Sequence, residues 1–323
     1  MKETKLMKAR RKILAAAMAA SAAGISLPGM AQDSFPSREI TLVVSYTPGG
    51  VTDLQARTIA THLGQELNTN IIVKNMPGAQ GTLGQEFVRR SKPDGYTLAM
   101  VTSSSTALSP YLVNDVYKPT DFDYVGGVGT ARFGLVVKAD SPYQNIGQFV
   151  EASKRKPIFY GSSSAITTMG FDKLAKVSGG GFEVINYKSG PEIVTAMLGG
   201  YVAALMQAPS EVMPFIDSGK ARLLASSGAT RWPSAPGVPT LREAGYDVAI
   251  ESWGGVAAPK GLPASVIKRL RDALQRTAAK PAMVRDLNAL GIQSSPLSGP
   301  EFGAKMQQTF VEAALTMKAM VKQ

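Results

Sequence analysis

The sequence contains no cysteine, a single histidine and two tryptophans among its 323 residues. The lack of cysteine excludes disulfides, thiolate nucleophiles and cysteine metal ligands. The one histidine, His62, lies inside a helical pattern and is an unsuitable base for Ser-His-Asp chemistry, and a Gly-x-Ser-x-Gly elbow is missing. The sequence also lacks a cluster of histidines or paired acids, so we expect no metal and no cofactor, and a role other than catalysis.

The start of the chain has the pattern of a secretion signal, which we place at residues 1–31. Six Lys/Arg residues precede an apolar, alanine-rich run at 13–27, and Ala31 ends a small-residue cleavage site. The run is too short to span a membrane comfortably. We therefore expect a periplasmic protein exported by the Sec route, with a twin-arginine route through Arg10 and Arg11 as the alternative.

Much of the positive charge belongs to this signal. Its removal takes away six cations and one acid, which lowers the net charge from +11 to +6. The remaining cations are scattered along the chain, so we expect no nucleic-acid partner. After cleavage, we expect no membrane-embedded segment.

The stretch 40–53, ITLVVSYTPGGVTD, predicts an anion-binding loop between a strand and a helix. Its first residues are apolar and β-prone, and Gly49 and Gly50 let backbone amides face outward without a Cβ in the way. Thr52 or Asp53 can cap the helix that follows. Free amides at a helix start favour a carboxylate or a phosphate without a basic side chain. Because the loop lacks the lysine and the glycine spacing of nucleotide-binding loops, we expect no nucleotide.

Strand-like and helix-like runs alternate along the chain, which predicts an α/β fold of mainly parallel sheets flanked by helices. Near 158–169 a strand, a polar loop and a helix repeat the design of the first loop. Two such lobes suggest a cleft that closes on a small anion. The expected strands are 40–46, 70–74, 96–102, 135–137, 158–160, 183–187, 202–206, 222–226 and 248–257, and the expected helices are 52–67, 82–90, 146–153, 167–177, 191–199, 210–218, 263–279, 281–290 and 299–322.

A series of motifs extends over residues 42–270. They are LVVSYTPGGVTDLQAR (42–57), NMPGAQGTLGQEFV (75–88), PDGYTL (93–98), INYKSG (185–190), LGG (198–200), GKARLLA (219–225), GVPTLREAGY (237–246) and ESWGGVAAPKGLPASVIKRL (251–270). In order and spacing they resemble the Bug family of solute-binding proteins, the extracytoplasmic receptors of tripartite tricarboxylate transporters. The resemblance implies a two-lobed, type II-like periplasmic-binding-protein fold with a ligand cleft between the lobes. It places one domain at 32–132 plus 252–323 and the other at 133–251.

The resemblance also implies that one loop from each domain holds a ligand carboxylate through backbone amides and hydroxyl groups. In the first domain the matching residues are Tyr46, Thr47, Pro48, Gly49, Gly50, Thr52, Asp53, Ala79 and the segment 103–106 with Ser103, Ser105 and Thr106. In the second domain they are Ser162, Ser163, Ser164, Thr167 and Thr168, with Tyr187 and Gln207 on the wall. Two roles stay open. Asp53 either caps its helix or contacts the ligand, and Lys188 either pairs with a second carboxylate or is a surface charge.

Two segments depart from the family pattern. The loop YGSSSAITTM at 160–169 is one residue shorter than usual, lacks the later glycines and has Met169 where histidine is common. The segment GGYVAALMQ at 199–207 has Ala203 and Gln207 where acids are usual. The loss of these acids favours a dicarboxylate or an aromatic carboxylate over an amino acid as the ligand.

The function that the resemblance implies is capture of a small carboxylate by lobe closure, followed by delivery to a membrane transporter of the tripartite tricarboxylate type. A receptor that feeds a two-component signalling sensor is the alternative, since both systems use the closed, liganded form. A serine-dependent enzyme is a third interpretation, which the single histidine and the missing elbow disfavour.

Overall fold

The computed structural model describes residues 35–113 and 116–321. The chain divides into two units, 1–37 and 38–323, and the second unit is described below. The predicted secretion signal lies outside the described residues. Among the helices of the described residues, none combines the length and the apolar character needed to cross a membrane.

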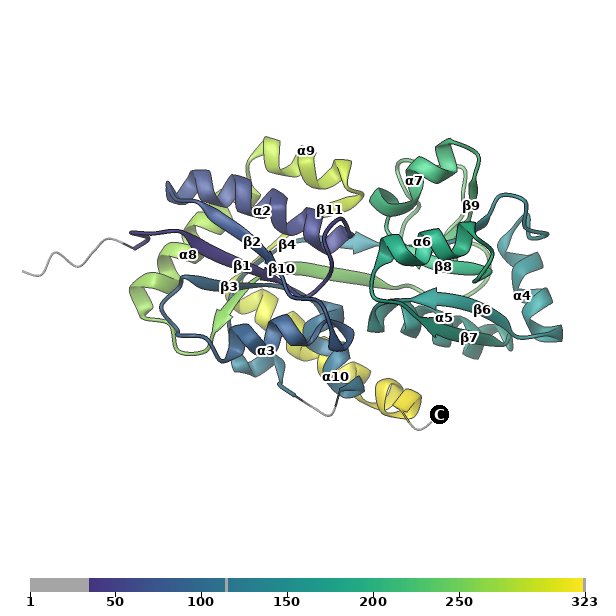
Figure 1. Cartoon of the computed structure of the whole chain (residues 1–323), viewed down its shortest axis with the longest axis horizontal. Coiled ribbons are helices and arrows are strands. Elements are labelled where there is room, and N and C mark those ends of the chain that lie inside the picture. Colours follow the sequence, from purple (N-terminus) through teal and green to yellow (C-terminus); the bar gives the residue numbers. More distant parts are fainter. Residues whose placement is uncertain (1–34, 114–115, 322–323) are drawn as a thin grey trace, which may run out of the picture. The chain divides into compact units, whose positions relative to one another are not determined.

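The first β-sheet of the described chain has the strand order β11-β4-β10-β3-β1-β2 (Figure 1). Strand β1 pairs in parallel with β2 and β3, whereas β10 pairs antiparallel with β3 and β4, and β11 antiparallel with β4. The bounds are β1 (Ile40–Val44), β2 (Ile71–Asn75), β3 (Thr97–Thr102), β4 (Phe122–Arg132), β10 (Glu251–Pro259) and β11 (Ile292–Ser298).

Helices cover both faces of this sheet. Helices α2, α8 and α9 contact one another over one face, while α3 and α10 pack on the other (Figure 1). Residues Ile40, Leu42, Val43 and Val44 of β1 are at most 1% exposed, because helices cover both faces of the strand. The bounds are α2 (Val51–Leu67), α3 (Leu83–Arg89), α8 (Ala264–Ala278), α9 (Pro281–Ala289) and α10 (Gly299–Val321), with short turns η1 (Ala79–Gly81), η2 (Ser103–Leu108), η3 (Ser109–Leu112) and η4 (Pro119–Asp121).

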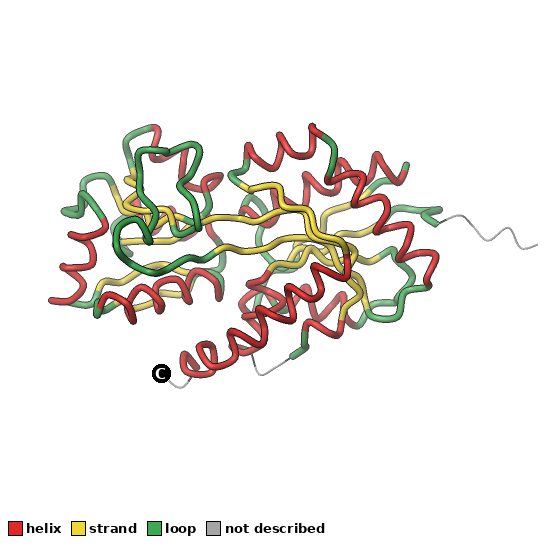
Figure 2. The backbone as a smooth tube through the Cα atoms, turned by 180° about the vertical axis from the view of Figure 1, so that it is seen from behind, coloured by secondary structure: helices red, strands yellow, loops and turns green. Residues whose placement is uncertain are grey.

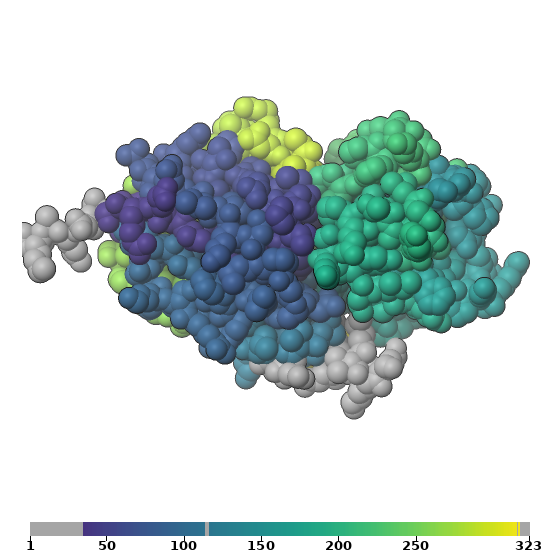
Figure 3. All heavy atoms as spheres, in the orientation of Figure 1, coloured from purple at the N-terminus to yellow at the C-terminus, as the bar shows by residue number. Residues whose placement is uncertain are grey.

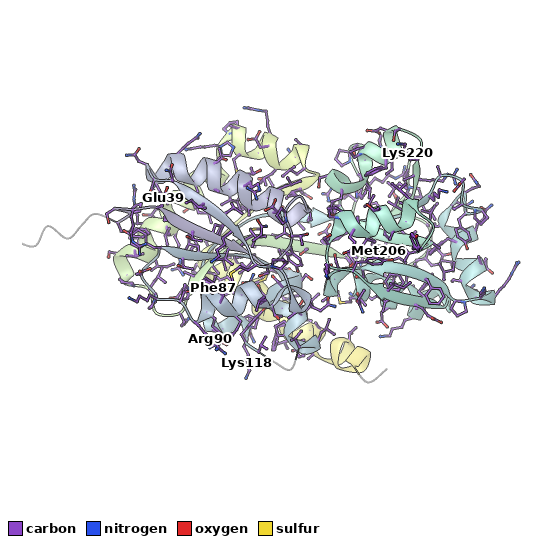
Figure 4. The ribbon with its side chains drawn as sticks, viewed as in Figure 1. Glu39, Phe87, Arg90, Lys118, Met206 and Lys220 are labelled. Atoms are coloured by element: carbon purple, nitrogen blue, oxygen red, sulfur yellow. The ribbon has the colours of Figure 1, made fainter. Side chains whose placement is uncertain are left out.

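The second sheet has the order β7-β6-β8-β5-β9. Strand β6 is parallel to β7 and β8, and β5 is antiparallel to β8 and β9. Met206 of β8 lies in the interior of this sheet, and Lys220 lies at the turn before β9 (Figure 4). The bounds are β5 (Gly134–Lys138), β6 (Ile158–Ser162), β7 (Phe182–Asn186), β8 (Ala204–Gln207) and β9 (Ala221–Ser226).

The helices of the second sheet also lie on both faces. Phe149 of α4 and Phe171 of α5 both pack against Phe182 of β7, whereas α6 and α7 contact each other and cover the opposite face (Figure 1). The bounds are α4 (Ile146–Arg155), α5 (Ala165–Ser178), α6 (Gly190–Leu198) and α7 (Pro209–Asp217).

The chain crosses between the two sheets twice. Phe133 alone separates β4 of the first sheet from β5 of the second, and the return path enters the first sheet at β10. The Ser227 N–H donates to the Phe133 carbonyl at 2.8 Å, and the Ile250 N–H donates to the Ser227 carbonyl at 2.7 Å. The two crossing segments therefore run side by side (Figure 2). Because these segments run in opposite directions, each sheet contains both parallel and antiparallel strand pairs. The predicted α/β class is confirmed. The prediction that the strand pairs are mainly parallel is wrong.

Strands β4 and β11 were not predicted. Glycines at 126, 127 and 129 lower the β-propensity of β4, yet each is required by close packing. A Cβ on Gly127 would lie 2.9 Å from Phe302, and one on Gly129 would lie 2.7 Å from the Gln293 carbonyl oxygen. The glycines therefore allow α10 and β11 to approach the β4 backbone closely.

Candidate functional site

The loop after β1 leads directly into α2, as the sequence predicts. Gly49 has a φ of +85°. Gly50 is the N-cap residue of α2, and it has no side chain to accept a hydrogen bond from the first amides of the helix. Asp53 instead reaches back, accepting hydrogen bonds from the Gly49 N–H at 2.9 Å, from Arg57 Nε at 2.9 Å and from Asn75 Nδ2 at 2.8 Å. Burial opposes ionisation of Asp53, but these bonds outweigh it and lower its pKa. Asp53 thus holds the loop from behind and leaves the first amides of α2 without an intrahelical partner.

A cavity of about 50 Å³ lies where the starts of four described helices meet, namely α2, α5, α6 and α7. Figure 3 shows atoms of the segment that follows β1, in purple, against green atoms of the helices of the second sheet. The lining residues are Tyr46, Thr47, Gly50, Val51, Thr52, Gln55, Thr102, Ser104, Ala131, Phe133, Ser163, Ser164, Ile166, Ser189, Gly190, Gln207, Glu211 and Ser252. Helix N-termini carry unpaired amides and partial positive charge, so this arrangement favours an anion.

The described lining of the cavity carries no positively charged side chain. The described residues that line it include no lysine, arginine or histidine, and the titratable ones are Tyr46 and Glu211. Burial raises the pKa of the Tyr46 phenol, so Tyr46 is a neutral hydrogen-bonding group at physiological pH. An anion in this cavity would be held by amides and hydroxyl groups rather than by an ion pair.

Gln55 adds a buried donor that has no partner. The residue is 2% exposed, and its Nε2 has no hydrogen-bond partner among the described residues. Its side chain lies over Gly254 of β10, where a Cβ would come within 2.5 Å of Oε1. A buried donor without a partner costs about 1–3 kcal/mol, and an acceptor oxygen in the cavity would remove that cost.

Glu211, the third residue of α7, is the one acid among the described lining residues. The residue is half-buried, and its Oε2 accepts a hydrogen bond from the Ala208 N–H at 3.4 Å. Burial raises the pKa of Glu211 to about 7, although the amides of Ala208 and Val51 favour the ionised form. The Val51 amide belongs to α2, so this carboxyl group links helices that cover different sheets.

A second hydrogen bond joins the two sides of the cavity. The N–H of Ile166, at the start of α5, donates to Ser104 Oγ at 3.3 Å. This amide has no intrahelical partner because it lies in the first turn. A side chain of η2, which follows β3 of the first sheet, thus accepts a hydrogen bond from a helix that packs on the second sheet.

The structure divides the predicted ligand residues into two groups, and ligand contact stays a prediction for both. Those that line the cavity are Tyr46, Thr47, Gly50, Thr52, Ser163, Ser164 and Gln207. Those outside its lining are Pro48, Gly49, Asp53, Ala79, Ser103, Ser105, Thr106, Ser162, Thr167, Thr168 and Tyr187.

Several residues of the outer group are bonded within the protein. Ser162 Oγ lies 2.7 Å from Thr167 Oγ1 and accepts from Thr168 Oγ1 at 2.9 Å, so these three hydroxyl groups satisfy one another behind the loop. Tyr187 packs against the apolar core of the second sheet. Ser105 Oγ accepts from the Thr102 N–H at 3.2 Å. These residues shape the loops that present the lining groups.

The sequence reasoning missed part of the lining, namely Val51, Gln55, Thr102, Ala131, Phe133, Ile166, Ser189, Gly190, Glu211 and Ser252. For the starts of α6 and α7 a signal was present. Pro191 and Pro209 occupy first-turn positions, and Glu192 and Glu211 follow at capping positions. A first-turn proline followed by a glutamate marks the start of a helix, so this pattern would have identified α6 and α7 as further amide donors.

The single histidine, His62, and Lys188, whose role the sequence leaves open, both lie outside the lining. His62 is 8% exposed, and its Nε2 lies 2.6 Å from Asp286 Oδ2 of α9. Lys188 is exposed, and its backbone N–H donates to Glu192 at 2.9 Å. The described residues contain no group of three or more histidines and acids arranged to hold a metal ion.

Replacing Ser104 with alanine is expected to weaken ligand binding about three- to tenfold, because a hydrogen bond across the cavity contributes roughly 0.5–1.5 kcal/mol. Ser103→Ala is the matched control, since Ser103 Oγ accepts from the Trp253 N–H at 3.2 Å on the side of the first sheet. Isothermal titration calorimetry measures both variants. Equal affinities for the two variants would contradict a role for the Ser104 bond in binding.

Comparisons with known proteins agree with this geometry. The model of the tripartite tricarboxylate transporter family receptor, TctC, matches residues 55–312. A Cupriavidus necator protein, described as the UPF0065 protein in the gbd 5' region, is 37% identical over 284 residues, which cover 85% of this chain and 86% of that protein. Protein BugT of Bordetella pertussis is 32% identical over 283 residues, which cover 83% and 85% of the two chains.

Solved structures show the same fold. The periplasmic binding protein BugD is 28% identical, with a TM-score of 0.82 over 89% of this chain and 99% of that chain. MatC from Rhodopseudomonas palustris, with bound malate, is 22% identical, with a TM-score of 0.79 over 89% of this chain and 100% of that chain. The chain therefore belongs to the tripartite tricarboxylate transporter receptor family, whose members include the Bug proteins and whose solved structures are periplasmic solute-binding proteins.

Proposed function

We propose that this receptor captures a small carboxylate in the cavity at the four helix starts and delivers it to a membrane transporter. The observation that supports this proposal is the meeting of α2, α5, α6 and α7 at a cavity whose described lining includes no basic side chain. Such a site suits an anion with several acceptor oxygens, because each helix start offers amides and the serines and threonines offer hydroxyl groups.

We also propose that the two sheets are the cores of two domains, 32–132 with 252–323 and 133–251. The two crossing segments that meet at Phe133, Ser227 and Ile250 would be the hinge. Ligand would favour the closed form, since only closure brings the amides of α2 and those of α5, α6 and α7 to the same molecule. The Ser104–Ile166 bond supports this mechanism, because it joins the two sides directly.

The proposed ligand class is a dicarboxylate or an aromatic carboxylate. The fold accommodates dicarboxylates, since MatC was solved with malate and a second R. palustris protein with adipate, at 22% and 24% identity to this chain. Glu211 of α7 supplies an acid in place of those missing at Ala203 and Gln207, so the loss of those two acids does not by itself disfavour an amino acid.

The proposed partner is the membrane part of a tripartite tricarboxylate-type transporter, for whose receptors the family is named. Delivery to a signalling sensor is the alternative, and deletion of the adjacent transporter genes would separate the two by its effect on uptake. We propose that the protein reaches the periplasm after removal of residues 1–31, by the Sec route.

The first test is a thermal-shift screen of the purified protein against mono-, di- and tricarboxylates, aromatic acids and amino acids. A ligand at a hundred times its Kd contributes about 2.7 kcal/mol to the stability of the folded state, which corresponds to roughly 4 °C in Tm for a protein of this size. We expect such a shift for one class of carboxylates. The uncharged amide of the best acid is the control, and an equal shift with the amide, or no shift across the screen, would contradict the proposal.

A further inference from the structure

The carboxyl group of Glu211 lies among the helix starts that the proposed function assigns to the ligand. It accepts from the Ala208 N–H ahead of α7 and faces the Val51 amide of α2. A Cβ on Gly50 would lie 3.6 Å from its Oε1, and a Cβ on Gly190 at the start of α6 would collide with the same atom. Three helix starts therefore surround one carboxyl group inside the cavity.

The charged groups on the adjoining elements are paired elsewhere. On α2, Arg57 binds Asp53 through two hydrogen bonds, at 2.9 and 3.0 Å. In the loop before α2, Tyr46 is a neutral phenol. None of the described residues that line the cavity is basic, so no side chain there neutralises Glu211.

The charged groups of the elements on the other sides also lie outside the cavity lining. At the start of α6, Lys188 is exposed and Glu192 accepts from its backbone N–H. On the crossing strand, Arg132 bonds to Gln293 and lies 3.9 Å from Glu251. Glu211 is thus a half-buried acid whose ionised form is favoured by the amides of Ala208 and Val51 and by no basic side chain of the described lining.

This arrangement has a consequence for any carboxylate ligand, and the argument rests on the proposed function. Under the proposed function, the ligand carboxylate binds among these helix starts and therefore beside Glu211, which lines the same cavity. Two adjacent carboxylates in an enclosed site cannot both stay ionised, and one of them takes up a proton. We propose that Glu211 is a specificity-determining residue that takes up one proton from solvent when the ligand binds and then donates a hydrogen bond from its carboxyl group to the ligand carboxylate.

The proposal predicts a definite selectivity. A protonated Glu211 offers a donor, which suits an acceptor oxygen of the ligand and not an ammonium group. Binding would therefore favour acids without an amino group and would strengthen as the pH falls through the pKa of Glu211, which burial raises to about 7. Linkage gives a Kd about tenfold lower at pH 6 than at pH 8.

The experiment is isothermal titration calorimetry of the purified protein with malate and adipate as probes, at pH 6 and pH 8, in pairs of buffers with different ionisation enthalpies. The dependence of the measured heat on the buffer counts the protons taken up. We expect nearly one proton per ligand at pH 8, few at pH 6, and the tenfold change in Kd. This count uses the unmodified protein and depends on no variant.

Glu211→Gln carries the donor permanently and is expected to bind the probes at both pH values with the affinity that the unmodified protein has at pH 6, without proton uptake. Glu243→Gln is the control, because Glu243 is on the surface beside Arg231 at 2.8 Å and outside the cavity, and it should keep the original pH profile. A Kd that is equal at pH 6 and pH 8, with no proton uptake, would overturn the inference. So would tighter binding of aspartate than of malate to the unmodified protein, if Glu211→Gln no longer prefers aspartate. Failure of both probes to bind at either pH, to the unmodified protein and to Glu211→Gln alike, would instead overturn the proposed function itself.

Discussion

Replacing Gly50 with aspartate is expected to raise the Kd for the carboxylate ligand more than a hundredfold. Gly50 lines the cavity at the start of α2, so the new carboxylate would lie beside the ligand carboxylate at the proposed anion site. Two like charges 4 Å apart repel by about 4 kcal/mol at the effective dielectric of a protein surface, and 2.7 kcal/mol already corresponds to a hundredfold change in affinity. Isothermal titration calorimetry with the acid selected by the thermal-shift screen measures the effect.

Gly50→Ala is the matched control for this prediction. Gly50 has a φ of −77°, which any residue adopts, and the nearest atoms to a new Cβ, at 3.6 and 3.8 Å, are at ordinary contact distance. We expect the alanine variant to bind within about threefold of the original protein. If the aspartate and alanine variants bound equally well, the amides at the start of α2 would not be the anion site.

Replacing Gly255 with alanine is expected to destabilise the fold by about 3 kcal/mol or more, the upper range for overpacking. Gly255 lies in β10 between β3 and β4. A Cβ there would collide with the carbonyl oxygen of Gly126 and lie 2.6 Å from Cε1 of Phe302. The carbonyl oxygen belongs to the neighbouring strand and cannot move without opening the ladder. Chemical denaturation of the purified variant measures the loss.

Gly237→Ala controls for the removal of a glycine as such. A Cβ at Gly237 would meet no atom within 4 Å, and its backbone conformation is one that alanine adopts freely. We expect a change within about 0.5 kcal/mol, the usual size for a surface substitution. A Gly255→Ala variant as stable as Gly237→Ala would mean that β4 and β10 can separate at little cost.

The helices and most strands of this chain could be predicted because their signals are local. The apolar run of β1 and the amphipathic pattern of α2 lie within a few residues of the observed bounds, 40–44 and 51–67. Strand β4 escaped prediction, since its glycines at 126, 127 and 129 are selected by α10 and β11, which are distant in sequence. The direction of strand pairing was equally hidden, because it depends on the two crossings between the sheets.

In the candidate site, too, some features could be predicted from local sequence and others depended on the tertiary structure. The loop at Gly49 and Gly50 was predicted from its turn chemistry and its place between a strand and a helix. The role of Asp53 behind that loop depends on Asn75, which belongs to the next strand, and so required the structure. Glu211 went unrecognised because nothing in its own segment shows that α7 begins beside α2.

The sequence by itself determined the α/β class, the helix starts that offer free amides, and, through its motifs, the receptor family. These properties depend on periodicity, turn residues and short motifs, all of which act over a few residues. Only the tertiary structure decided that four helix starts meet at one cavity, that the serines at 162–164 divide between lining and support, and that an acid lies among the amides. The meeting of the helix starts and the position of Glu211 depend on contacts between segments that are far apart in the sequence, such as α2 and α7, and local patterns carry no information about such contacts.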